Sequence, residues 1–175
     1  MRWLPMDDQH YATGLTVGVA ALLLLTSALL LCVPLNFFQG LVPTPILPLC
    51  LIFIYGLLRP DSLRPTIVFL VGIVQDLLFG AAVGPWASVY LLAHVLIVWQ
   101  RSYFIGRDAT VLTTGFAATS GLALLLYWFE MSILGSRPMP MLPLLWQWTI
   151  TVLSFPLVLT LFQRSIGRPR PKLAE

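Results

Sequence analysis

Charge is scarce in this sequence. Only 10% of its 175 residues are Asp, Glu, Lys or Arg, against roughly 25% in soluble globular domains. So few charges cannot cover a water-exposed surface, which excludes an ordinary soluble domain. The ten Lys and Arg residues are dispersed between apolar blocks and at the C-terminal end. Because they form no basic stripe, the net charge of +3 does not predict a nucleic-acid partner.

Cysteine and histidine are equally sparse. Cys32 and Cys50 lie inside apolar runs, and two such thiols make neither a disulfide framework nor a metal site. We expect both to be small buried hydrophobic residues. His94 has no second His or Cys at the spacing of metal ligands, so we expect no metal. Its expected role is helix packing, through a bond to a neighbouring helix, and a proton relay is the alternative.

Signatures of known catalytic sites are missing too. The chain has no P-loop, GxSxG elbow, HExxH motif or dinucleotide fingerprint. A nucleophile, a base and an acid could be chosen as Ser88, His94 and Asp76. Any chain of this size offers such a triple, so this one does not predict a catalytic site. The sequence therefore predicts no catalytic residue, no enzymatic activity and no cofactor.

Long apolar runs are what the sequence has in abundance. Hydrophobic residues make up 58% of it and the mean hydropathy is +0.89, so the expected solvent is lipid. Breaks rich in Pro, Gly or charge leave six candidate transmembrane helices, at residues 13–33, 46–58, 63–79, 85–100, 109–131 and 143–162. We predict an all-α integral membrane protein, a compact bundle of about six transmembrane helices in one domain, residues 1–163. A short basic cytoplasmic tail follows, residues 164–175, which anionic membrane lipid would attract.

The second of these helices is too short to cross a bilayer unaided. Its 13 residues, 46–58, rise about 20 Å against a hydrocarbon core of roughly 30 Å. The preceding segment Pro43-Thr44-Pro45 must therefore also lie at membrane depth, where lipid cannot satisfy irregular backbone. This predicts that other helices of a compact bundle shield it.

If the chain crosses the membrane six times, nearly all of its basic residues fall on one side of the membrane. Nine of the ten then fall on the side of both termini, and only Arg137 falls on the other side. By the positive-inside rule, we expect a multi-pass protein with both termini cytoplasmic. Aromatic residues also gather at two levels, with Trp86, Trp128, Trp146 and Trp148 outside and Tyr55, Trp99, Tyr103 and Phe104 inside. We expect interfacial anchors, and an aromatic-lined binding site is the alternative.

Ionisable side chains inside a span cost roughly 2.5–3.5 kcal/mol each near the helix centre. Asp76 and Glu130 lie near the outer ends of the third and fifth spans. A hydrated acid at a helix end is the plainer interpretation of Glu130. Gln75 and Gln147 fall at a comparable depth. We hypothesise that these four side chains converge on an outward-opening polar pocket that a partner or ligand would use.

Small residues mark the expected helix contacts. Gly72 precedes Asp76 by four residues and leaves room for a neighbouring helix to approach. Gly14 and Gly18 form a GxxxG pattern at the start of the first span. This pattern predicts tight helix packing, either within the bundle or against a partner helix.

The segment from Gly72 to Gly80, GIVQDLLFG, is followed by Val83-Gly84 and by Tyr90-Leu91-Leu92. Together these residues resemble the signature of the rod shape-determining protein MreD family, and the resemblance covers about residues 43 to 163. It implies a non-enzymatic scaffold of the cell-wall elongation machinery in the bacterial inner membrane. The implied partners are an MreC-like bitopic protein, a RodA-type glycosyltransferase, a class B penicillin-binding transpeptidase and the MreB cytoskeleton. Asp76 and its flanking glycines, Gly72, Gly80 and Gly84, are the positions that we expect to matter most.

The MreD family is similar in fold to the substrate-binding membrane subunits of energy-coupling factor transporters. These are six-helix bundles with an outward-opening pocket, so a vitamin-binding or other small-molecule subunit is the alternative function. Such subunits use Ala-rich coupling motifs on their first and third helices. Ala20-Ala21 lies in the first span here, but residues 63–79 contain no matching small-residue run. We therefore favour the scaffold.

Overall fold

The fold is described from a computed structural model, in which residues 6–32, 44–80, 82–135 and 140–166 are described. This part of the chain is all-helical, as predicted. Its six α-helices and one short 3-10 turn are α1 (Met6–Cys32), α2 (Leu47–Leu58), η1 (Pro60–Ser62), α3 (Pro65–Phe79), α4 (Pro85–Phe104), α5 (Ala109–Leu134) and α6 (Met141–Ile166).

Each of the six segments expected to be helical is a helix, and the differences lie at the ends. α1 begins at Met6 rather than at residue 13, α4 continues to Phe104, and α6 ends at Ile166. In all three cases the helix runs on past the apolar block into polar residues. Hydropathy marks where a side chain prefers lipid, whereas polar residues such as Arg and Gln still have good helix propensity. The apolar pattern therefore ends before the helix does.

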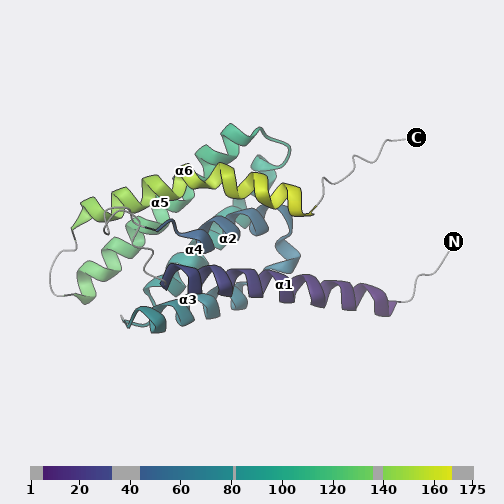
Figure 1. Cartoon of the computed structure of the whole chain (residues 1–175), viewed down its shortest axis with the longest axis horizontal. Coiled ribbons are helices and arrows are strands. Elements are labelled where there is room, and N and C mark those ends of the chain that lie inside the picture. The colour runs from purple at the N-terminus through teal and green to yellow at the C-terminus, as the bar shows by residue number, and fades with distance from the viewer. Residues whose placement is uncertain (1–5, 33–43, 81, 136–139, 167–175) are drawn as a thin grey trace.

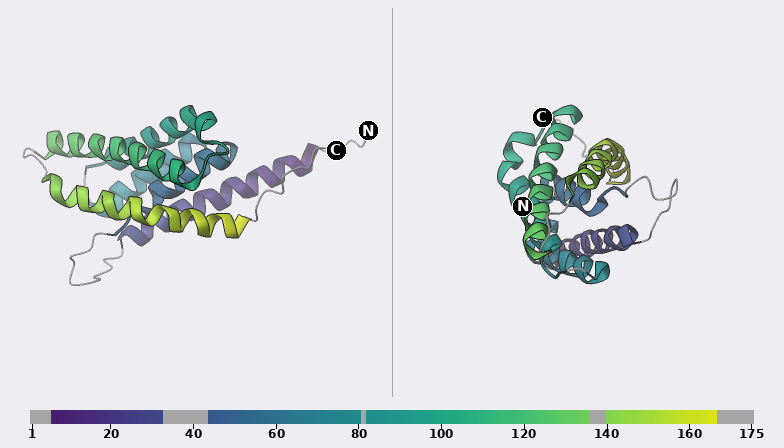
Figure 2. Two further views of the ribbon diagram at one scale, coloured as in Figure 1. Left: turned by 90° about the horizontal axis from the view of Figure 1, so that it is seen from above. Right: turned by 90° about the vertical axis from the view of Figure 1, so that its left-hand side faces the viewer.

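The helices form one elongated bundle (Figure 1). The start of α1 and the end of α6 lie at the same end of it, and the first turns of α1 extend beyond the other helices (Figures 1 and 2). We call this the terminal end and the opposite one the distal end. α3 and α4 run antiparallel and meet at the distal end, where α3 finishes and α4 begins.

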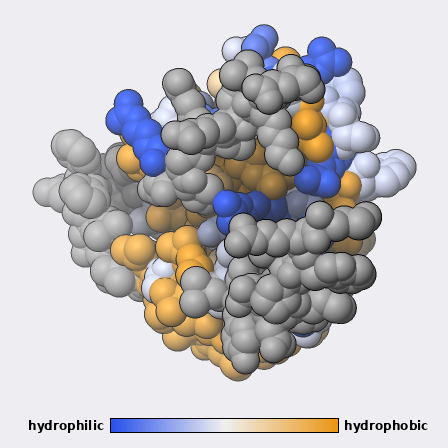
Figure 3. All heavy atoms as spheres, turned by 90° about the vertical axis from the view of Figure 1, so that its right-hand side faces the viewer, coloured by the Kyte–Doolittle hydropathy of each residue, from blue (hydrophilic) through white to orange (hydrophobic). Residues whose placement is uncertain are grey.

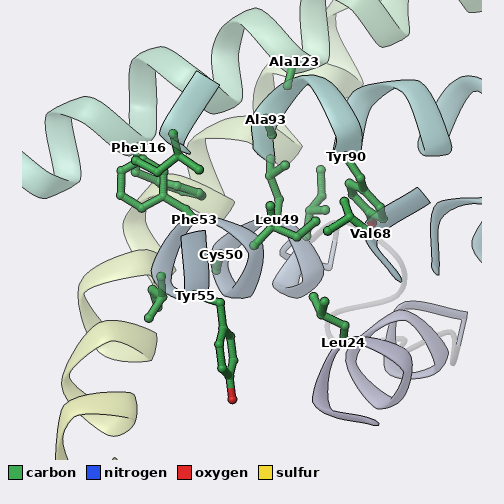
Figure 4. Close-up of a cluster of buried hydrophobic side chains, with 14 of the residues drawn as sticks. Leu24, Leu49, Cys50, Phe53, Tyr55, Val68, Tyr90, Ala93, Phe116 and Ala123 are labelled. Atoms are coloured by element: carbon green, nitrogen blue, oxygen red, sulfur yellow. The ribbon is translucent and has the colours of Figure 1, made fainter. Parts of the chain in front are cut away.

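α2 forms the centre of the bundle (Figure 4). Nine of its 12 residues are buried, because it is apolar on every side and contacts α1, α4, α5 and α6. The ring of Phe53 packs edge-on against three other rings, with centroid distances of 5.4 to 6.0 Å, those of Phe104, Phe116 and Phe155. Cys50 is fully buried, as expected, whereas the surroundings of Cys32 lie outside the described residues.

The irregular segment that leads into α2 is held by α6. The N–H of Ile46, a residue with no exposed surface, donates to Thr151 Oγ1 at 3.1 Å. Gln147, one turn earlier on α6, donates from Nε2 to the Thr44 carbonyl at 3.4 Å. Two α6 side chains thus supply hydrogen bonds that lipid could not, which is the shielding that the short second helix requires.

Apolar side chains cover much of the bundle's outer surface. Large apolar side chains with more than half of their surface exposed occur on every α-helix except α2. Examples are Leu22, Leu70, Val95, Ile133 and Leu153. α5 and α6 are long and apolar enough to cross a membrane, and α1, α2 and α3 contain shorter apolar stretches. Only 33% and 22% of the apolar windows of α5 and α6 are buried within the protein. Most of their apolar surface is therefore left for another apolar phase to cover.

Hydrophilic side chains gather at the terminal end, whereas apolar ones lie along its flanks (Figure 3). All described Lys and Arg residues belong to this end, at the loop before α3, the end of α4, the start of α5 and the end of α6. Arg101 also joins two helices, because its Nε donates to the Leu57 carbonyl at 2.9 Å. The last carbonyls of a helix lack intrahelical partners, so Arg101 on α4 caps the end of α2.

Candidate functional site at the turn between α3 and α4

The carboxylate of Asp76 binds the first turn of α4. Asp76 lies in α3 and has no exposed surface. Its Oδ2 accepts a hydrogen bond from the Gly84 N–H at 2.8 Å, and its Oδ1 accepts one from the Trp86 N–H at 3.0 Å. Pro85, the first residue of α4, has no N–H to satisfy. Asp76 therefore caps α4 from a different helix, and the positive end of the helix dipole stabilises its charge.

Two glycines shape the turn that brings Asp76 to α4. Gly80 ends α3 in the left-handed conformation, with φ 63°, and its N–H donates to the Leu77 carbonyl at 3.2 Å. Gly84 immediately precedes α4 and has φ 131°. A side chain would strain the backbone at either angle. Both glycines of the motif therefore have a conformational role.

Gly72 is the point of closest approach between α3 and α4. A Cβ atom added to it would lie 2.7 Å from the Ala87 N and 2.9 Å from the Trp86 C, closer than van der Waals contact allows. The obstructing atoms are backbone atoms, which cannot swing aside as the end of a side chain can. The absence of a side chain at Gly72 thus lets α4 pack close enough for Asp76 to reach its first turn.

Two further polar candidates also bond to α4. Gln75, fully buried in α3, accepts a hydrogen bond at Oε1 from the Tyr90 hydroxyl at 2.6 Å, and its Nε2 has no partner within the described residues. Glu130 of α5 is partly exposed, and its Oε2 lies 2.7 Å from the Ser88 hydroxyl. The Pro85 carbonyl lies 2.8 Å from that same hydroxyl, whose single proton serves one acceptor at a time. Gln75, Asp76 and Glu130 thus tie α3 and α5 to the start of α4.

A cavity of about 240 Å³ opens at the distal end, which we call the distal cavity. Its lining consists of Leu31, Thr44, Phe79, Trp86, Tyr127 and Gln147. Of the four polar residues hypothesised to converge on one pocket, only Gln147 lines this cavity. Gln75, Asp76 and Glu130 make the hydrogen bonds to α4 described above, so among the described residues this cavity does not join the four around a single pocket.

The remaining candidates have mixed outcomes. His94 is buried and packs beside Gly56 of α2, but its Nδ1 has no hydrogen-bond partner within the described residues. Among the described residues, Nδ1 therefore does not supply the hydrogen bond to a neighbouring helix that we expect of His94. Gly18 has nothing within 4 Å of the position of an added Cβ, so packing within the bundle is wrong for this glycine. The surroundings of Gly14 lie outside the described residues.

Sequence reasoning missed several residues that build this region. Trp86, expected as an interfacial anchor, is 5% exposed, and its ring packs on Tyr127 with centroids 4.6 Å apart. Thr151 was not singled out, although it follows Gln147 by four residues and therefore shares a helix face with it. Such a pair is too common in apolar helices to predict a contact. The geometry of the α2 entry segment was needed to identify it.

Comparison with known proteins adds no relative: neither family models, nor curated proteins, nor solved structures show a match to this chain. Among the described residues, no group of three His, Cys, Asp or Glu side chains is placed to hold a metal ion. The site at the turn between α3 and α4 is built from a buried carboxylate that caps a helix, two glycines that shape the turn, and a third glycine that permits close packing.

Proposed function

We propose that this protein is a multi-pass inner-membrane scaffold of the bacterial cell-wall elongation complex, of the MreD type, without enzymatic activity of its own. It would maintain rod shape by holding an MreC-like bitopic protein together with a RodA-type glycosyltransferase and a class B penicillin-binding transpeptidase. Contact with the MreB cytoskeleton would occur at the cytoplasmic side.

The membrane location is supported by where the apolar surface lies. In a water-soluble protein, helices as apolar as α5 and α6 would be mostly buried, and contiguous exposed apolar patches larger than a few hundred Å² are rare. Here most of the apolar windows of both helices remain unburied. The terminal end carries all the described basic residues, which supports a cytoplasmic assignment of that end by the positive-inside rule. The distal end would then face the periplasm.

The observation that carries the proposal is the turn between α3 and α4. The residues that resemble the MreD signature fall into one structural unit, in which Gly72 permits the helix contact, Asp76 caps α4, and Gly80 and Gly84 form the turn. Each of these four residues therefore has a defined structural role, although their closeness follows from their spacing in the sequence. This supports the resemblance, and with it the function that the resemblance implies.

Partners would bind surfaces other than Asp76, because its side chain is buried and both of its oxygens are occupied. Gly18 is the contrasting case, since among the described residues nothing beyond its own stretch of helix lies within 4 Å of its Cβ position. Helix association in lipid relies on close contact at small residues. The stretch of α1 around Gly18 is therefore where we place a partner helix.

Depletion of the protein in its host tests the proposal, with cell width and lateral peptidoglycan incorporation as the measurements. We expect rods to widen or round and lateral incorporation to fall. Complementation then compares Asp76→Ala with Arg137→Ala, and we expect the Asp76 variant to restore shape less well. Crosslinking from a residue placed at 18 to an MreC-like partner provides the direct test. Unchanged cell shape on depletion would refute the scaffold.

The second candidate, a vitamin-binding transporter subunit, is favoured by one observation, the distal cavity. Sites for drug-sized ligands occupy roughly 300–1,000 Å³, whereas the distal cavity measures about 240 Å³. The size of this cavity argues against a ligand as large as most vitamins, so we retain the scaffold as the conclusion. Uptake of labelled vitamins by cells with and without the protein would decide between the two.

A further inference from the structure

The distal cavity lies where all six helices meet. Each of its lining residues comes from a different helix or its entry segment: Leu31 from α1, Thr44 before α2, Phe79 from α3, Trp86 from α4, Tyr127 from α5 and Gln147 from α6. Ligand sites are concave, mostly apolar and fitted with a few convergent polar groups, often between the helices of bundles. The distal cavity has this position between helices and has convergent polar groups, among them Gln147, although its lining is about as polar as it is apolar.

The polar groups of the cavity favour a hydrogen-bond donor as the ligand. Gln147 uses its Nε2 to bond the Thr44 carbonyl, which leaves its Oε1, the acceptor atom of the amide, for a ligand. The Tyr127 hydroxyl oxygen can also accept a hydrogen bond. A ligand with several N–H groups on one atom would match this arrangement.

The rings and charges around the cavity favour a positive ligand. Phe79, Trp86 and Tyr127 all line it, and the faces of aromatic rings attract cations within about 6 Å of the ring centroid. Two acids, Asp76 and Glu130, belong to the distal end among the described residues, and Arg137, which the sequence places on the same side, lies outside them.

We propose that the distal cavity binds the primary ammonium group of a small organic cation, which donates to Gln147 Oε1 and lies against the rings of Phe79, Trp86 and Tyr127. Its volume of about 240 Å³ suits a headgroup-sized ligand. Two sources have this chemistry: the ethanolamine headgroup of a membrane lipid and a soluble amine. The inference goes beyond the scaffold function and does not rest on it, because ligand binding and cell shape are measured separately.

The test uses the full chain purified in detergent, with ethanolamine as the probe and ethylene glycol as its neutral isostere. Binding is followed by ligand-detected NMR, which does not depend on the many tryptophans of the chain. We expect ethanolamine to bind saturably and ethylene glycol not to bind. Short-chain phosphatidylethanolamine is compared with phosphatidylglycerol of the same chain length in parallel. Tighter binding of phosphatidylethanolamine than of free ethanolamine would assign the site to a lipid headgroup, and the reverse order would assign it to a soluble amine.

Variants link binding to the cavity. Gln147→Leu should weaken binding about tenfold or more, because it removes a hydrogen bond to a charged group. Phe79→Ala, at a partly exposed position, should weaken it about two- to fivefold through the lost cation–π contact. This second variant keeps the test valid if Gln147→Leu does not fold. Phe129→Ala is the matched control, since this exposed ring does not line the cavity.

Three results would overturn the proposal. The first is the absence of saturable binding by either amine, and the second is equal binding of ethylene glycol and ethanolamine. The third is unchanged affinity in both folded cavity variants. Normal cell shape on depletion would leave the ligand proposal intact, and failure of amine binding would leave the scaffold intact.

Discussion

Gly72 and Gly18 offer a paired test of how closely α3 and α4 pack. Both are helical glycines, but a Cβ at Gly72 would meet the backbone of Ala87, whereas a Cβ at Gly18 would meet nothing within 4 Å. Overpacking a tight contact costs about 1–3 kcal/mol, and replacing a helical glycine by alanine gains roughly 0.5–1 kcal/mol. Because the obstructing atoms at Gly72 belong to backbone, we expect Gly72→Ala to lose roughly 1–2 kcal/mol net. Gly18→Ala should be neutral or gain up to about 0.5 kcal/mol, since helices in lipid largely persist on unfolding.

The free energy of unfolding is measured by SDS titration of each purified variant, with far-UV circular dichroism to verify helix content. A separation of roughly 1–2.5 kcal/mol between the two alanine variants, in the stated direction, is the expected result. Gly72→Ser, which adds one more atom, should be at least as destabilising as Gly72→Ala. The reasoning fails if Gly72→Ala and Gly18→Ala have the same stability as the natural protein, because α3 and α4 would then not be in backbone contact at Gly72.

Three further substitutions test the hydrogen bonds between helices by the same titration. Asp76→Ala should cost about 3–5 kcal/mol, because two N–H groups lose a charged acceptor. Asp76→Asn should cost less, because its amide oxygen still accepts one hydrogen bond. Equal losses in the two variants would contradict the two-bond geometry. Thr151→Val should cost about 1–3 kcal/mol by leaving the buried Ile46 N–H unsatisfied. Thr149→Val, whose exposed hydroxyl bonds only within α6, should stay within roughly 0.5 kcal/mol of the natural protein, and equal effects of the two valines would rule out the proposed bond. Arg101→Leu should lose about 1 kcal/mol with its cap on the Leu57 carbonyl, and no loss would mean that solvent replaces the cap.

The sequence predicted the helices and the residues of the turn better than it predicted how polar groups pair. Asp76 was singled out because an acid is costly inside an apolar span, and Gly72 because a small residue lets a neighbouring helix approach. Gly80 and Gly84 were singled out through the resemblance to the MreD signature. Gln75, Glu130 and Gln147 were also singled out, but their partners could not be predicted. Depth along a helix places a residue at a level of the membrane, whereas the direction in which it points depends on how each helix is rotated.

The α2 entry segment shows the same limit. Its shielding followed from length alone, because 13 residues cannot span roughly 30 Å. The residue that provides the hydrogen bond, Thr151, could not be identified from α6 alone, where several hydroxyls occupy similar positions. His94 is the converse case, since a lone polar residue predicts a partner, and among the described residues its Nδ1, beside Gly56 of α2, has none.

In the proposed multi-pass arrangement, the cap that Asp76 provides for α4 has a consequence for how the chain would enter the membrane. α4 is not among the helices that are apolar enough to cross a bilayer by composition, and its first N–H groups would be costly to bring into lipid alone. The carboxylate of Asp76 would be costly alone for the same reason. When α3 and α4 are together, the carboxylate and these N–H groups bond each other, so neither has to be hydrated. We therefore expect α3 and α4 to insert as a pair, so that the turn between them sets the order of assembly as well as the final structure.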